Sequence, residues 1–113
     1  MQVEARQKEA DNSMAIIKDP EGNEIATLHA MVDFKNRRVL EVGCGEGRLT
    51  WRYADKAEHV TAIDPDGKAI ATARANMPKQ SEEQVSFLES TIEDFANSFS
   101  DQRFDIAIFS WSL

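Results

Sequence analysis

Short apolar runs alternate with amphipathic segments along most of the chain. Short apolar runs are typical of buried strands, whereas apolar residues spaced three or four positions apart give a helix one buried face. The predicted strands are 39–42, 60–63, 85–88 and 104–109, and the predicted helices are 49–54, 67–77 and 92–99. Asp66 is placed to cap the second of these helices, and Pro78 is placed to end it.

This order of elements predicts an α/β fold class. Parallel strands need a long connection, and the helices between the predicted strands supply it through right-handed crossovers. We therefore expect a Rossmann-like, mainly parallel sheet with helices on both faces, incomplete and with about four core strands.

The N-terminal part of the chain is less regular. Residues 1–12 are almost entirely polar, which predicts a frayed tail or a solvated helix, and the apolar run 14–17 stops at a turn over 19–23. Apolar positions then predict a helix from Glu24 to about Phe34. We accordingly divide the chain into an N-terminal tail and turn, 1–23, and one domain, 24–113.

Composition and charge exclude several classes of function. The chain has 13 Lys and Arg against 20 Asp and Glu, a net charge of −7, and such a surface repels nucleic acid. There is neither an apolar run long enough to cross a membrane nor a signal peptide, so we expect a cytoplasmic protein without a membrane partner. The single cysteine, Cys44, is expected to be a packing residue, and with His29 and His59 it shows no metal-ligand spacing.

The chemistry is expected in a glycine-rich turn after the first core strand. Gly43, Gly45 and Gly47 let the backbone turn sharply and leave space for a ligand against main-chain N–H groups. The alternative is a tight turn without a ligand. A nicotinamide dinucleotide is disfavoured, because its fingerprint requires a third glycine where Arg48 stands and its pyrophosphate would not favour the Glu41 carboxylate.

The segments 39–47, 60–66, 85–95 and 104–110 resemble, in order, motifs of the class I S-adenosylmethionine-dependent methyltransferases. The resemblance implies that Glu41 and the main chain around Gly43 and Gly45 hold the methionine amino and carboxylate groups, with Ser110 nearby. Asp64 follows Gly43 by 64 − 43 = 21 residues, near the offset at which an acid accepts both ribose hydroxyls.

The resemblance further places the adenine against Thr91 and Ile92, with Glu93 or Asp94 as a partner for its amino group; the alternative is that these acids only face solvent at the start of a helix. No catalytic residue and no metal ligand is assigned. The expected cofactor-binding residues are Glu41, Gly43, Cys44, Gly45, Gly47, Asp64, Pro65, Thr91, Ile92, Glu93 and Ser110.

The resemblance implies the S-adenosylmethionine-binding half of an enzyme that methylates a small-molecule acceptor. The alternative is a binding module without chemistry. Residues 104–113 are apolar and belong in the centre of a complete sheet, so we expect a truncated domain that is inactive alone. An exposed apolar edge at this last strand predicts self-association.

Overall fold

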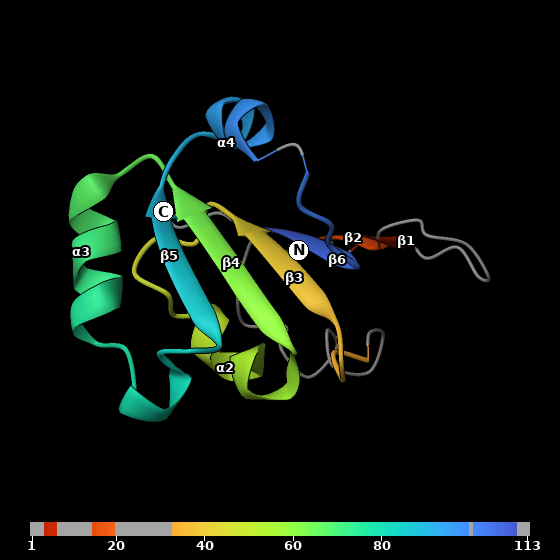
Figure 1. The fold of residues 1–113 in the computed structure, drawn as a ribbon, viewed down its shortest axis with the longest axis horizontal. Helices are drawn as coiled ribbons and strands as arrows, with labels where there is room; N and C mark the ends of the chain where they lie inside the picture. The colour runs from red at the N-terminus through yellow and green to blue at the C-terminus, as the bar shows by residue number, and fades with distance from the viewer. Residues whose placement is uncertain (1–3, 7–14, 20–32, 100, 111–113) are drawn as a thin grey trace.

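The computed structural model describes residues 4–6, 15–19, 33–99 and 101–110. It contains one six-stranded sheet in the order β1-β2-β6-β3-β4-β5 (Figure 1). Four of these strands are the predicted core: β3 (Arg38–Val42), β4 (His59–Asp64), β5 (Val85–Glu89) and β6 (Ile106–Ser110). The neighbouring pairs among them are all parallel, which confirms the predicted fold class.

The helices lie between the core strands, as the spacing of apolar residues predicts. They are α2 (Thr50–Tyr53), which continues as the 3-10 helix η1 (Ala54–Lys56), then α3 (Gly67–Ala75), the 3-10 helix η2 (Lys79–Ser81) and α4 (Ile92–Ser98). Asp66 caps α3, because its side chain accepts hydrogen bonds from the backbone N–H groups of Lys68 and Ala69 at 3.0 and 3.4 Å.

Both faces of the sheet are covered by helices. Successive strand residues point to opposite faces, so Val39 joins a large core that contains Tyr53 of α2 and Ile70 of α3, while Leu40 joins a smaller core with Phe95 of α4. In the large core the rings of Phe34 and Tyr53 stack with their centroids 4.8 Å apart.

Residues 4–6 of the predicted tail lie in a strand, and residues 20–23 of the predicted turn lie outside the described residues. Residues Glu4–Arg6 form β1 and residues Ala15–Asp19 form β2, which pair antiparallel with each other. β2 also pairs with β6, far along the chain, and β1 is held only by β2, so local sequence reveals neither strand. The helix predicted for 24–34 lies outside the described residues except for its end, where Phe34 is buried and not helical.

The apolar edge that we expect at the last core strand is not exposed. β2 runs parallel to β6, with Ala15 opposite Ile106 and Asp19 opposite Ser110, while β3 pairs with the other side of β6. The prediction of an exposed edge is therefore wrong, because a segment from the other end of the chain satisfies the backbone groups of β6. Self-association stays a prediction, without this argument for it.

Candidate functional site

The carboxyl ends of the core strands lie at one edge of the sheet, and in Figure 1 the arrowheads of β3, β4 and β5 point to the same end. From β3 the chain proceeds outward through β4 to β5 and then returns to place β6 on the other side of β3. In open α/β sheets, ligands bind outside the carboxyl ends at such a switch point. The glycine-rich turn follows β3 at this point.

The turn has the backbone shape that its glycines predict. Gly43, Gly45 and Gly47 have φ values of 81°, 57° and 88°, a region that favours glycine. A Cβ atom on Gly43 would collide with the Ser110 carbonyl oxygen, and one on Gly47 would lie 3.0 Å from Cζ of Phe87. The turn is therefore fitted closely against β6 and β5.

Asp64, at the end of β4, holds the glycine-rich turn and the next loop together. Its Oδ2 accepts a hydrogen bond from the Gly45 N–H at 2.9 Å, and its Oδ1 accepts one from the Asp66 N–H at 2.8 Å. A carboxylate has about four acceptor positions, two on each oxygen. Each oxygen of Asp64 thus retains capacity for one further donor, which is what the two hydroxyls of a ribose require.

Glu41 is fully buried beneath the turn. Its Oε1 accepts hydrogen bonds from the hydroxyls of Thr50 and Tyr53, both at 2.7 Å, and its Oε2 accepts one from Ser110 at 2.8 Å. Burial raises the pKa of Glu41, and these three hydrogen bonds oppose the rise. Glu41 is 0% exposed, so its carboxylate does not face solvent in this structure.

Thr50 and Tyr53 are residues that sequence reasoning missed as members of the site. They are three positions apart in α2, a spacing that places both side chains on one helix face. This spacing was the available signal, but only the folded chain shows that the face meets Glu41.

The turn's cysteine and the segment after β5 complete the candidate site. Cys44 is buried, with its sulfur 3.6 Å from the Gly45 carbonyl oxygen, and burial raises its pKa, in keeping with the predicted packing role. The Ser90 N–H donates to the Asp64 carbonyl oxygen at 3.0 Å, which draws the predicted adenine segment toward the predicted ribose acid.

Within that segment, Thr91 caps α4 by accepting from the Asp94 N–H at 3.1 Å. Ile92 is 37% exposed, and Pro65 and Glu93 are also exposed. The structure therefore brings the predicted residues of 41–47, 64–65, 91–93 and Ser110 to one edge of the sheet. Among the described residues no cluster of His, Cys, Asp and Glu could hold a metal ion, and no helix could span a membrane.

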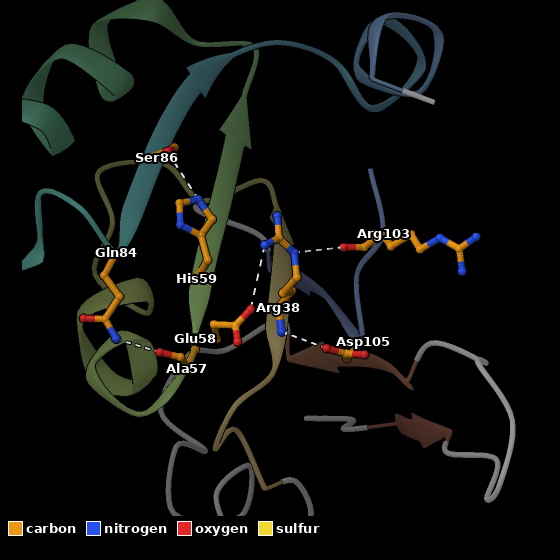
Figure 2. A network of polar contacts seen from close by, with 8 residues as sticks. All are labelled: Arg38, Ala57, Glu58, His59, Gln84, Ser86, Arg103 and Asp105. Atoms are coloured by element: carbon orange, nitrogen blue, oxygen red, sulfur yellow. Dashed lines mark hydrogen bonds and ion pairs between the residues drawn. The ribbon is translucent and has the colours of Figure 1, made fainter. Parts of the chain in front are cut away.

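The opposite edge of the sheet carries a different polar network (Figure 2). The Arg38 N–H donates to Oδ2 of Asp105 at 2.9 Å, and the Asp105 N–H returns a bond to the Arg38 carbonyl oxygen at 2.8 Å. The Arg38 guanidinium lies 3.8 Å from the Glu58 carboxylate, with the two side chains 44% and 55% exposed. Nearby, burial is the main cause that lowers the pKa of His59.

A mainly parallel sheet with a glycine-rich turn at its switch point and an acid on the neighbouring strand defines a class of α/β domains that bind nucleoside-containing cofactors. Residues 33–113 match the model of a family described as a methyltransferase domain, and the chain belongs to this family.

Two relatives illustrate the match. The chain is 35% identical over 75 residues to the "Probable cobalt-precorrin-6B C(15)-methyltransferase (decarboxylating)" of Methanobrevibacter smithii, across 60% of this chain and 40% of that protein. It is 38% identical over 60 residues to a ubiquinone biosynthesis O-methyltransferase of Aromatoleum aromaticum, across 53% of this chain and 25% of that protein. The chain thus spans less than half the length of these relatives.

Solved structures agree with this assignment. A precorrin 8W decarboxylase from Methanobacterium thermoautotrophicum superposes with a TM-score of 0.64 at 26% identity, covering 80% of this chain and 50% of that one. A SAM-dependent methyltransferase from Thiobacillus denitrificans, in complex with S-adenosyl-L-homocysteine, superposes with a TM-score of 0.60 at 28% identity, covering 80% of this chain and 36% of that one.

Proposed function

We propose that this chain is the S-adenosylmethionine-binding part of a methyltransferase. The observation that carries the proposal is the Asp64 carboxylate, fixed by the Gly45 and Asp66 N–H groups with one acceptor position spare on each oxygen. It stands beside a glycine-rich turn, at the switch point of a sheet whose family is that of methyltransferase domains.

Each part of the cofactor has candidate partners in the chain. Asp64 accepts the two ribose hydroxyls, and the segment 91–93 borders the adenine. The ammonium group of the methionine part donates a hydrogen bond to the Gly43 carbonyl oxygen in the turn. This oxygen lies close to Ser110, which also contacts the buried Glu41. When bound, the cofactor supplies a sulfonium methyl group for transfer to a nucleophile.

We propose a small molecule as the methyl acceptor. The names of two relatives, a cobalt-precorrin methyltransferase and a ubiquinone biosynthesis O-methyltransferase, support this class. The net charge of −7 further disfavours an acceptor with a phosphate backbone. Methyl transfer is proposed for the whole protein, since the chain covers only 40% and 25% of these relatives.

Calorimetric titration with S-adenosylhomocysteine tests the cofactor. We expect saturable one-to-one binding of S-adenosylhomocysteine and none of NAD⁺ at the same concentration. Binding of NAD⁺ in preference would replace the proposal with a dinucleotide-binding domain. Absence of S-adenosylhomocysteine binding would overturn the cofactor assignment itself.

A test of the class of methyl acceptor requires the full-length protein and S-adenosylmethionine with a labelled methyl group. We expect label from S-adenosylmethionine to appear in the small-molecule fraction of a cell extract. Label that appeared only in the protein or RNA fraction would contradict the proposed acceptor and leave the cofactor assignment intact.

A further inference from the structure

One hydroxyl group in the candidate site faces two acceptors. Ser110 Oγ lies 2.8 Å from Oε2 of Glu41 and 3.1 Å from the carbonyl oxygen of Gly43. A serine hydroxyl has a single proton, so at any moment it donates to only one of these two oxygens. The protonation of Glu41 decides which one.

The two carboxylate oxygens of Glu41 accept different numbers of hydrogen bonds. Oε1 already accepts from both Thr50 and Tyr53, which fills its acceptor positions, so a proton taken up by this acid resides on Oε2. When Glu41 is ionised, Oε2 can only accept and the Ser110 proton points toward it. When Glu41 is protonated, Oε2 donates to Ser110 Oγ, and the Ser110 proton turns to the Gly43 carbonyl.

We infer that Ser110 is a positioning residue that links the protonation of Glu41 to the acceptor capacity of the Gly43 carbonyl, and through it to the binding of the cofactor's ammonium group. The inference rests on the proposed function, which places that ammonium at the glycine-rich turn. Ionised Glu41 leaves the Gly43 carbonyl open to the ammonium, whereas protonated Glu41 occupies part of its capacity with the Ser110 hydroxyl.

The other titratable groups that face Glu41 do not compete for this role. Tyr53 in α2 and Cys44 in the turn both have pKa values raised, mainly by burial, so they stay neutral near neutral pH. The negative charge of Asp64 on β4 adds to the rise in the pKa of Glu41, for which burial is the largest cause. Acidification therefore protonates Glu41 at a higher pH than an exposed glutamate.

The test is calorimetric titration of the full chain with S-adenosylhomocysteine, repeated from about pH 8 down to about pH 5. We expect the wild-type affinity to fall on acidification, by up to about tenfold per pH unit below the pKa of Glu41. In Ser110→Ala the fall should shrink to less than about twofold across the range, because the link between acid and carbonyl is cut. Ser110→Thr keeps the hydroxyl and should restore the fall.

Two further variants complete the design. In Glu41→Gln the amide N–H donates to Ser110 at every pH, so its affinity should be independent of pH and as low as that of the wild type in acid. Ser86→Ala removes a half-buried hydroxyl at the opposite edge, 3.3 Å from His59, and should retain the wild-type curve. If Glu41→Gln does not fold, the pair of Ser110 variants still decides the question.

A Ser110→Ala curve that kept the full acidic fall would overturn the inference. A Ser110→Ala curve with the same fall in affinity, shifted to higher pH, would also overturn it. The variant would then have lost only a hydrogen bond that lowers the pKa of Glu41, and the carboxylate would act on the ligand by its charge alone. A wild type that binds with no pH dependence would overturn the inference and leave the proposed function standing. A wild type that binds at no pH would overturn the proposed function.

Discussion

Asp64 and Asp105 stand at opposite ends of the same sheet and make the same hydrogen bond. Each accepts from a backbone N–H at 2.9 Å, Asp64 from Gly45 and Asp105 from Arg38. Asp105 is exposed and its bond joins the start of β3 to the residue before β6. Asp64 is half-buried at the switch point, and its bond shapes a turn of positive-φ glycines.

Hydrogen-bond geometry alone therefore does not distinguish the structural carboxylate of Asp105 from that of Asp64, which we propose to bind the ribose. Position in the topology does, since ligands bind at the carboxyl ends of parallel strands and not at their amino ends. The surroundings do so as well. Glu41 near Asp64 is fully buried, whereas the Arg38–Glu58 ion pair near Asp105 is open to solvent.

The largest expected effect is that of Gly43→Ala. The left-handed φ of 81° costs an alanine about 1–3 kcal/mol, and the collision with the Ser110 carbonyl adds to it, so we expect a loss of more than about 3 kcal/mol in the free energy of unfolding. Binding of S-adenosylhomocysteine should be lost as well. Denaturant unfolding and calorimetry measure the two effects.

Gly67→Ala is the matched control for that variant. Its Cβ would lie 2.6 Å from Oε1 of Glu89, the end of a side chain that can rotate away, so the free energy of unfolding should change by less than about 1 kcal/mol. Equal losses in the two alanine variants would show that the turn is not fitted against β6.

Next in size is the difference between Asp64→Ala and Asp105→Ala. Each variant loses a 2.9 Å hydrogen bond to a backbone N–H. We expect Asp64→Ala to weaken S-adenosylhomocysteine binding by about 1.5–3 kcal/mol, about tenfold or more, because the ribose loses a charged acceptor. Asp105→Ala should leave the affinity unchanged. Equal affinities of the two variants in calorimetry would remove the functional distinction between the ends of the sheet.

The buried carboxylate gives a pH-dependent effect on stability. Because burial raises the pKa of Glu41 in the folded chain above its ordinary value, its contribution to the free energy of unfolding is greatest below the unfolded pKa and is lost as pH rises through the folded pKa. The stability of Glu41→Gln relative to the wild type should therefore increase across that window and then level off. Thermal unfolding at several pH values measures it, and a relative stability that decreases instead would mean that the pKa of Glu41 is lowered.

The smallest effect is expected at the amino end of the sheet. Glu58→Gln removes an ion pair of 3.8 Å between side chains that are 44% and 55% exposed, which is worth less than about 1 kcal/mol and is screened by salt. Unfolding at low and high salt measures this loss. A loss of several kcal/mol in the free energy of unfolding, or a weaker affinity for S-adenosylhomocysteine, would show that this edge has a role beyond holding the strands together.

Most of the core fold could be predicted from sequence because its signals are local. Apolar runs mark β3 to β6, and the cap at Asp66 is visible from residue type alone. The strands β1 and β2 could not be predicted, because they are short, β2 is held by pairing with β6 far along the chain, and β1 is held only by pairing with β2. The prediction of an exposed edge at β6 is wrong for the same reason, because β2 pairs with that strand.

The candidate site divides in the same way. The glycine-rich turn and Asp64 were visible in the sequence because turn chemistry and the spacing between them are local properties. The partners of Glu41 were not, since Thr50, Tyr53 and Ser110 follow it by 9, 12 and 69 residues and meet it only in the folded chain. No spacing rule predicts that three hydroxyls converge on one carboxylate.

The central claim is that the carboxyl edge of the sheet binds S-adenosylmethionine and the amino edge does not. Titration of the isotope-labelled chain with S-adenosylhomocysteine, followed by the backbone amide NMR signals, tests it most directly. We expect saturable shifts at residues 43–49, 64, 66, 90–93 and 110, with the signals of Arg38, Glu58 and Asp105 unmoved. Shifts centred on Arg38 and Asp105, or no shifts at millimolar ligand, would contradict the account.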